Sequence, residues 1–246
     1  MSEEREAIVQ RITESAARVF DLRRSAQADP KAAAGRQALR AWQVQRLART
    51  HADLLEHPKF AQAATFFLTD VYGANDSSFR DEELHRVIPT MTKLMPAAGL
   101  ETVADAIGLD ALSEELDAAM VKALGRNVRA IDAVAYGEAY RKVGRREDRE
   151  RQIELVRGVG HSLDRLTRQP FVGTTLSLMR KPAKLAGLSN LQSFLERGYH
   201  AFHAIGDAEE FIRCILDREE ALLGALFAGD DSLLDLDAHE FARRTA

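Results

Sequence analysis

Apolar residues recur at intervals of three and four positions through most of the chain, which is the spacing of one face of an α-helix. Ile8 and Ile12 begin such a face near the N-terminus. The runs 188–205 and 212–226 repeat the spacing most clearly, although Glu219 occupies the apolar stripe of the second run. Alternating Val, Ile and Thr positions, which would indicate strands, are missing. The pattern therefore predicts an all-α protein.

Few residues interrupt these patterns, since the 246 residues contain only six prolines and fifteen glycines. Asp29-Pro30 separates the first two segments, and Pro89 is expected to kink or interrupt the fourth. The predicted helices span about 3–26, 31–56, a segment from Pro58 to about Tyr72, a segment from Ser78 through Pro89, 97–107, 109–124, 127–143, 145–168, 171–180, 188–206 and 207–228. We expect a multi-helix, bundle-like fold of about ten helices, with residues 1–246 as one domain that could divide only near 125–145.

Five glycines fall inside predicted helices, where each costs about 1 kcal/mol relative to alanine. They are Gly137, Gly158, Gly160, Gly198 and Gly224. Close approach of another helix is the favoured explanation, and a ligand against the backbone is the alternative.

Composition and terminal sequence exclude several classes of protein. The net charge of −4 argues against a dedicated nucleic-acid binder. The single cysteine, Cys214, rules out an intramolecular disulfide and a cysteine-rich zinc site. The polar start of the chain does not resemble a signal peptide, and no run approaches the ~18 consecutive apolar residues of a membrane span. A cytoplasmic protein is expected.

Charge is distributed unevenly. Residues 141–184 contain twelve Lys or Arg and five Asp or Glu, a net of +7, so the rest of the chain carries 22 basic and 33 acidic residues, a net of −11. Four basic residues surround an apolar segment, 171–179, and are candidates for binding an anion or a protein partner: Arg168, Arg180, Lys181 and Lys184. A solvated helix face is the alternative.

A second candidate is a stripe of possible metal ligands. At 100° per residue, its members fall within about 60° of one another on one helix. They are Glu196, His200, His203 and Asp207. Carboxylate and imidazole groups suit Fe or Mn, and di-iron bundles use such inward-facing residues. However, those bundles need two Glu-x-x-His helices, and the chain has one such pair, Glu82 and His85. A solvated stripe is the alternative, and we expect no cofactor.

Two polar residues lie within apolar patterns. Glu219 would need a partner such as an arginine from another helix. His51 lies among leucines and is expected to be partly buried and hydrogen-bonded rather than a haem or metal ligand.

The segment 66–73, which reads FFLTDVYG, resembles a motif of an uncharacterised bacterial family of all-helical proteins. The segments 159–170, 178–183 and 191–198 resemble the same family, so the similarity extends from about residue 50 to 228. The resemblance implies one helical unit and attaches no activity to it.

These observations favour a non-catalytic helical binding or regulatory protein, whose partner is an unknown protein or an anionic small molecule. It could form a homodimer through an apolar helix face. The alternative is a metal- or haem-dependent helical oxidoreductase, with Fe, Mn or haem as cofactor.

Overall fold

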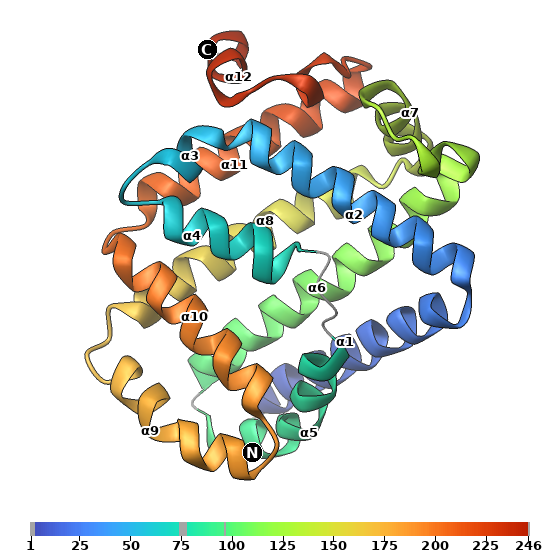
Figure 1. Cartoon of the computed structure of the whole chain (residues 1–246). Helices are drawn as coiled ribbons and strands as arrows, with labels where there is room; N and C mark the ends of the chain where they lie inside the picture. Colours follow the sequence, from blue (N-terminus) through green and yellow to red (C-terminus); the bar gives the residue numbers. More distant parts are fainter. Residues whose placement is uncertain (1–2, 74–77, 96, 246) are drawn as a thin grey trace.

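The computed structural model describes residues 3–73, 78–95 and 97–245 (Figure 1). It is 88% helical, and no strand occurs within these ranges. The predicted all-α fold class is therefore confirmed. No helix in the described ranges is both long enough and apolar enough to span a membrane.

The helices follow one another with short connections. The first half contains α1 (Glu3–Ala28), α2 (Pro30–Thr50), α3 (Ala52–Glu56), α4 (Ala61–Phe66), the π-helix η1 (Phe67–Val71), α5 (Ser78–Leu94) and α6 (Ala97–Leu124). The second half contains the 3₁₀-helix η2 (Gly125–Arg129), α7 (Ala133–Val143), α8 (Arg146–Thr167), α9 (Val172–Leu185), α10 (Ser189–Ile205), α11 (Glu209–Ala228), the 3₁₀-helix η3 (Ser232–Asp235) and α12 (Ala238–Thr245).

Helix boundaries follow local capping chemistry. The Asp29 side chain accepts a hydrogen bond from the Lys31 amide at 2.9 Å, and Pro30 occupies the first position of α2. Asp132 caps α7 in the same way, and Gly144 ends that helix with φ of +65°. These signals are local in sequence, so they do not depend on tertiary contacts.

Several predicted boundaries were wrong. Helix α5 runs through Pro89 to Leu94 without an interruption. Residues 97–124 form one helix, α6, which continues through Gly108. The helix predicted at 127–143 begins only at Ala133, after η2. The helix predicted at 171–180 continues through Pro182 to Leu185, and the segment 31–56 is interrupted at His51. In α6 and α9, packing outweighs the local cost of one glycine or proline.

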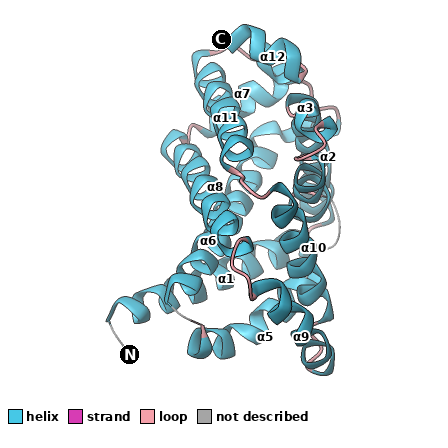
Figure 2. Ribbon diagram, turned by 90° about the vertical axis from the view of Figure 1, so that its left-hand side faces the viewer, coloured by secondary structure: helices cyan, strands magenta, loops and turns pink. Residues whose placement is uncertain are grey.

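The helices form two layers (Figures 1 and 2). One layer contains α2, α3, α4 and α10, and the other contains α6, α7, α8 and α11. Helix α1 packs along α6 at one end, near α5, while α12 lies at the opposite end. Three apolar clusters fill the interior, around Leu226 and Phe241, around Phe202 and Phe211, and around Ile12.

Three of the five helix glycines lie at close contacts, as expected. A Cβ on Gly137 would overlap the Asp231 carboxylate, one on Gly160 would lie 3.2 Å from Ile212, and one on Gly198 would lie 3.0 Å from Phe66. A Cβ on Gly158 would have only ordinary contact, and one on Gly224 would meet nothing within 4 Å.

Candidate functional site

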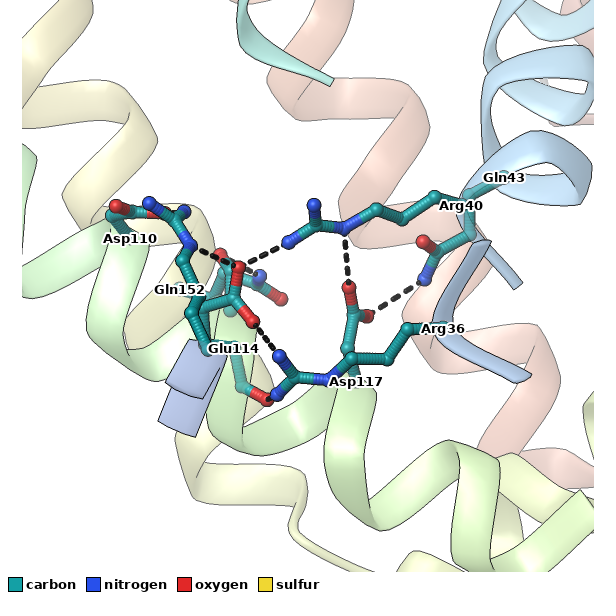
Figure 3. A network of polar contacts seen from close by, with 9 residues as sticks. Arg36, Arg40, Gln43, Asp110, Glu114, Asp117 and Gln152 are labelled. Carbon is teal, nitrogen blue, oxygen red and sulfur yellow. Dashed lines mark hydrogen bonds and ion pairs between the residues drawn. The ribbon is translucent and has the colours of Figure 1, made fainter. Parts of the chain in front are cut away.

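A buried ion-pair network joins the N-terminal helices to α6 (Figure 3). Glu114 of α6 is 1% exposed, and it contacts Arg23 of α1 together with Arg36 and Arg40 of α2. Its Oε1 accepts from Arg23 Nε at 2.8 Å, and Arg36 Nη1 lies 2.6 Å from Oε2. Arg36 also donates to the Glu114 carbonyl oxygen at 3.0 Å. The carboxylate therefore ties three helices together.

The arginines keep this carboxylate ionised. Burial by itself raises the pKa of Glu114, but the charges of Arg23, Arg40 and Arg36 outweigh burial and hold the pKa below its ordinary value. Nearby Asp117 behaves in the opposite way, because burial raises its pKa more than the hydrogen bond from Gln43 lowers it. We interpret this network as structural.

A second network surrounds Glu219 of α11. The expected arginine from another helix is Arg46 of α2, which donates to Glu219 Oε1. His51 Nε2 lies 3.2 Å from the same oxygen, and His51 is buried, as its sequence context predicts. Burial raises the pKa of Glu219, but Arg46 and His51 outweigh it and lower the pKa to about 2. Arg218 extends the network by a two-point contact with Asp53 at 2.7 and 2.6 Å.

A polar groove of about 510 Å³ lies between α6 and α8. Its charged residues are largely occupied by one another or by neighbours. Asp105 pairs with Arg11 at 2.6 Å, Arg157 pairs with Glu220 at 2.6 Å, and Arg165 donates to Ser162 at 2.9 Å. No set of unpartnered groups on its walls therefore points to a ligand.

The predicted metal ligands of α10 make other contacts. Glu196 accepts from Arg180 and Gln192, each at 2.7 Å. His203 donates from Nδ1 to the Thr167 carbonyl oxygen at 2.8 Å.

The other two members of the stripe are His200 and Asp207. Asp207 accepts from the Glu209 amide at 3.1 Å and from Arg168 at 3.3 Å, while the His200 side chain is exposed. Within the described residues, no three Asp, Glu, His or Cys side chains are grouped so that they could hold one metal ion. The metal-site hypothesis therefore rests on sequence spacing alone.

The sequence segments that carry the family resemblance meet around α10. Asp70 accepts from Arg197 Nε at 2.8 Å, and Phe66 packs against Gly198. Asp164 of α8 accepts from the amide of Ala208, just before α11 begins. Contacts between helices thus account for these motif residues without a ligand.

The four predicted basic residues separate into two pairs. Arg168 forms ion pairs with Asp164 and Asp207, and Arg180 pairs with Glu196 at 2.7 Å. Lys181 and Lys184 are exposed, and neither forms an ion pair with any residue that the structure describes. Of the four predicted residues, the two lysines are therefore the ones without an ion pair among the described residues.

Beside these lysines, α9 presents three large apolar side chains to solvent. Phe171 is 77% exposed, Leu178 is 73% exposed and Leu185 is 91% exposed. They are seven residues apart, so at 100° per residue they fall within about 40° of one another. Ala183, the buried residue of α9, lies about 140° away on the opposite side. Around the helix axis, Lys181 lies about 60° from Leu178 and Lys184 about 120° from it, both on the same side of the stripe. We call the exposed residues Phe171, Leu178, Leu185, Lys181 and Lys184 the α9 outer face.

Contacts on the other side of α9 hold the helix in place. A Cβ on Gly173 would lie 2.6 Å from Tyr199 Oη, so the glycine lets α9 approach α10 closely. Gln192 of α10 donates to the Leu176 carbonyl oxygen at 2.7 Å, and Arg86 of α5 donates to the Gly187 carbonyl oxygen at 2.8 Å. These contacts orient the apolar stripe outward.

Sequence reasoning identified the lysines but missed the apolar stripe. The available signals were the spacing of seven residues and a run of charge, because residues 165–195 contain five Lys or Arg and no Asp or Glu. Spacing alone could not decide which side of an apolar helix would be buried.

The described residues thus define an all-α protein of two helical layers with an exposed apolar and basic helix face. The family model for a domain of unknown function, DUF8198, matches residues 22–233, so the chain belongs to this family. The match includes all of α9, and it confirms the assignment to an uncharacterised family. No match was found among curated proteins or solved structures.

Proposed function

We propose that the chain is a non-catalytic helical binding protein that uses the α9 outer face to bind anionic, amphiphilic partners. The observation that carries this proposal is the stripe of Phe171, Leu178 and Leu185, each more than 70% exposed, with the unpaired Lys181 and Lys184 to one side of it. Soluble proteins expose single apolar residues commonly, but aligned large ones are typical of interaction surfaces.

The buried charges support binding rather than catalysis. Glu114 and Glu219 have lowered pKa values, but both join helices. Glu114 contacts three arginines of α1 and α2, and Glu219 contacts Arg46 of α2 and His51. A perturbed pKa can mark an active site, yet structural ion-pair networks cause the same shifts. The α9 outer face, by contrast, has no structural task within the described chain.

A polarity-sensitive dye next to the stripe tests this proposal. Thr175 is exposed at the edge of the stripe, so we would label a Thr175→Cys variant in a Cys214→Ala background. Two anionic amphiphilic probes would be added separately: phosphatidylglycerol vesicles and an acidic amphipathic helical peptide. At least one probe should shift the dye emission to the blue, and inorganic phosphate should not.

The control carries the dye at Val134 of α7, which is 58% exposed and lies outside the α9 outer face. Its emission should not respond to either probe. Circular dichroism would confirm that both labelled variants keep the helical content of the parent. If the emission of the Thr175 label does not change with either probe, or if the Val134 label responds equally, the proposed function is wrong.

A further inference from the structure

We propose that the α9 outer face docks on an anionic lipid bilayer, with α9 lying parallel to the membrane surface. This inference rests on the proposed function, and it names the partner. The chain would bind as a peripheral protein, because none of its described helices is suited to span the membrane.

The shape of the surface favours a bilayer. The stripe projects outward from a peripheral helix, and its three apolar side chains are 73–91% exposed rather than set in a groove. A flat, deformable lipid interface accepts such side chains from a single helix, whereas a protein partner would need a groove of matching shape. Phe and Leu are suited to the boundary between headgroups and acyl chains.

The charge of the segment favours anionic lipid. Lys181 lies next to the stripe, and Lys184 lies farther round the same side of the helix. Both are exposed, and long lysine side chains can reach the headgroups while their carbon chains stay near apolar surface. Residues 165–195 contain no carboxylate, and the carboxylates on either side of this range, Asp164 and Glu196, are ion-paired with Arg168 and Arg180. Each lysine near an anionic membrane surface contributes roughly a fivefold gain in affinity.

The rest of the molecule would be oriented away from the membrane. Helix α9 lies at one end of the molecule, and α12 lies at the other end (Figures 1 and 2). The segment 230–240 beside α12 contains five Asp or Glu and no Lys or Arg. Three of these carboxylates form ion pairs with arginines, namely Asp230 with Arg244, Asp231 with Arg141 and Asp235 with Arg49. An anionic surface would therefore attract the lysines of α9 and repel the remaining carboxylates, Asp237 and Glu240, at the opposite end.

Other occupants fit these observations less well. Pairing of α9 with α9 of a second copy would bring the unpaired Lys181 and Lys184 of both copies together, and like charges repel. A small soluble anion could contact the lysines, but it would leave Phe171, Leu178 and Leu185 exposed. A bilayer uses both the apolar and the basic residues of the surface.

Vesicle co-sedimentation tests this inference. Wild-type protein should bind vesicles of phosphatidylcholine with 30% phosphatidylglycerol, and it should bind vesicles of phosphatidylcholine alone much more weakly. Lys181→Gln with Lys184→Gln should weaken binding to the anionic vesicles about 25-fold, at about fivefold per lysine. Leu178→Ser with Leu185→Ser should weaken it at least tenfold, since two apolar side chains leave the interface. High salt should weaken wild-type binding.

Matched controls separate surface effects from loss of folding. Val134→Ser removes another exposed apolar side chain and should leave vesicle binding unchanged. The thermal midpoints of the α9 variants should match the wild type, because the substituted side chains are exposed. Equal binding by wild type and both double variants, or no preference for anionic vesicles, would overturn the inference.

The two proposals can fail separately. If the Thr175 label responds to the acidic peptide but wild-type protein does not bind anionic vesicles, the lipid proposal is wrong and the binding function stands. A second outcome would assign the surface to another copy of the chain. In that case, wild-type protein would not bind vesicles, and size-exclusion chromatography would show that Leu178→Ser with Leu185→Ser converts a dimer to a monomer. The lipid proposal would again be wrong. If the Thr175 label responds to neither probe and wild-type protein does not co-sediment with anionic vesicles, both proposals are wrong.

Discussion

Glu219 and Glu114 are carboxylates whose charge is balanced by arginines from other helices. Arg46 contacts Glu219, and Arg23, Arg36 and Arg40 contact Glu114. Removing one partner of such a pair costs about 3–5 kcal/mol, because the remaining charge stays buried without compensation. These residues therefore specify which helices lie together more than they add net stability.

The lowered pKa of Glu219 predicts a loss of stability in acid. A carboxyl whose pKa falls from 4.5 to about 2 on folding stabilises the native state fully above about pH 4.5. That contribution is lost as the pH falls toward 2, and it amounts to at most about 3 kcal/mol. The free energy of unfolding, measured with urea from pH 6 to pH 2.5, should therefore decrease across this window.

Glu219→Gln should show a shallower decrease than wild type over the same pH range, because glutamine does not titrate. Glu220→Gln is the matched control, since Glu220 is half-exposed and pairs with Arg157 at the surface. Its pH dependence should follow the wild type. A Glu219→Gln curve parallel to wild type between pH 4.5 and 2.5 would contradict the assigned pKa.

At the scale of helices, α9 shows how a short element acquires two faces with different tasks. Gly173, Leu176 and Ala183 lie on the side that approaches α10, and Leu178 and Leu185 lie on the other. The buried side needs small residues and backbone contacts, while the outer side is free of packing constraints. The same helix can therefore be fixed by one face and bind through the other.

Helix contacts also predict opposite effects for two glycines. Gly137→Ala should destabilise the protein by about 2 kcal/mol or more, because its Cβ would displace the Asp231 carboxylate that pairs with Arg141 of α7. Gly224→Ala of α11 should stabilise it by about 0.5–1 kcal/mol, because the Cβ meets nothing within 4 Å and alanine favours helix. Urea unfolding measures both changes. Equal effects of the two substitutions would show that close packing does not explain Gly137.

At the scale of the molecule, α6 connects regions that are far apart in sequence. It packs on α1, α2, α7 and α8. Its buried Glu114 joins α1 to α2 through their arginines. The segment 125–145, where the chain could have divided, packs back on this helix through α7 and η2. The helices are therefore expected to unfold together.

Thermal unfolding should accordingly show one cooperative transition. The midpoint followed by circular dichroism should coincide with that followed by fluorescence of Trp42, which stacks on Tyr136 at 4.3 Å between ring centroids. Calorimetric and van't Hoff enthalpies should agree. Two separated transitions would instead indicate that the chain divides into independently folding parts.

The sequence by itself determined the fold class and much of the helix pattern. Apolar spacing of three and four predicts helices because it matches a local geometry of 3.6 residues per turn, and caps such as Asp29-Pro30 act within a few residues. Its errors in α6 and α9 have one cause. Local propensity disfavoured Gly108 and Pro182, but contacts between distant residues, which no local pattern contains, kept those helices intact.

The candidate site was determined only in part by sequence. Lys181 and Lys184 could be identified as basic residues from the sequence, but only the structure showed that they are left without an ion pair among the described residues. Arg168 pairs with Asp164, four residues earlier on α8, and also with Asp207. Arg180 pairs with Glu196, which the docking of α9 on α10 brings close. The docking of α9 on α10 decided that Leu178 and Leu185 point outward. The same apolar spacing is compatible with either face of the helix turned inward, because burial is a property of the assembled chain.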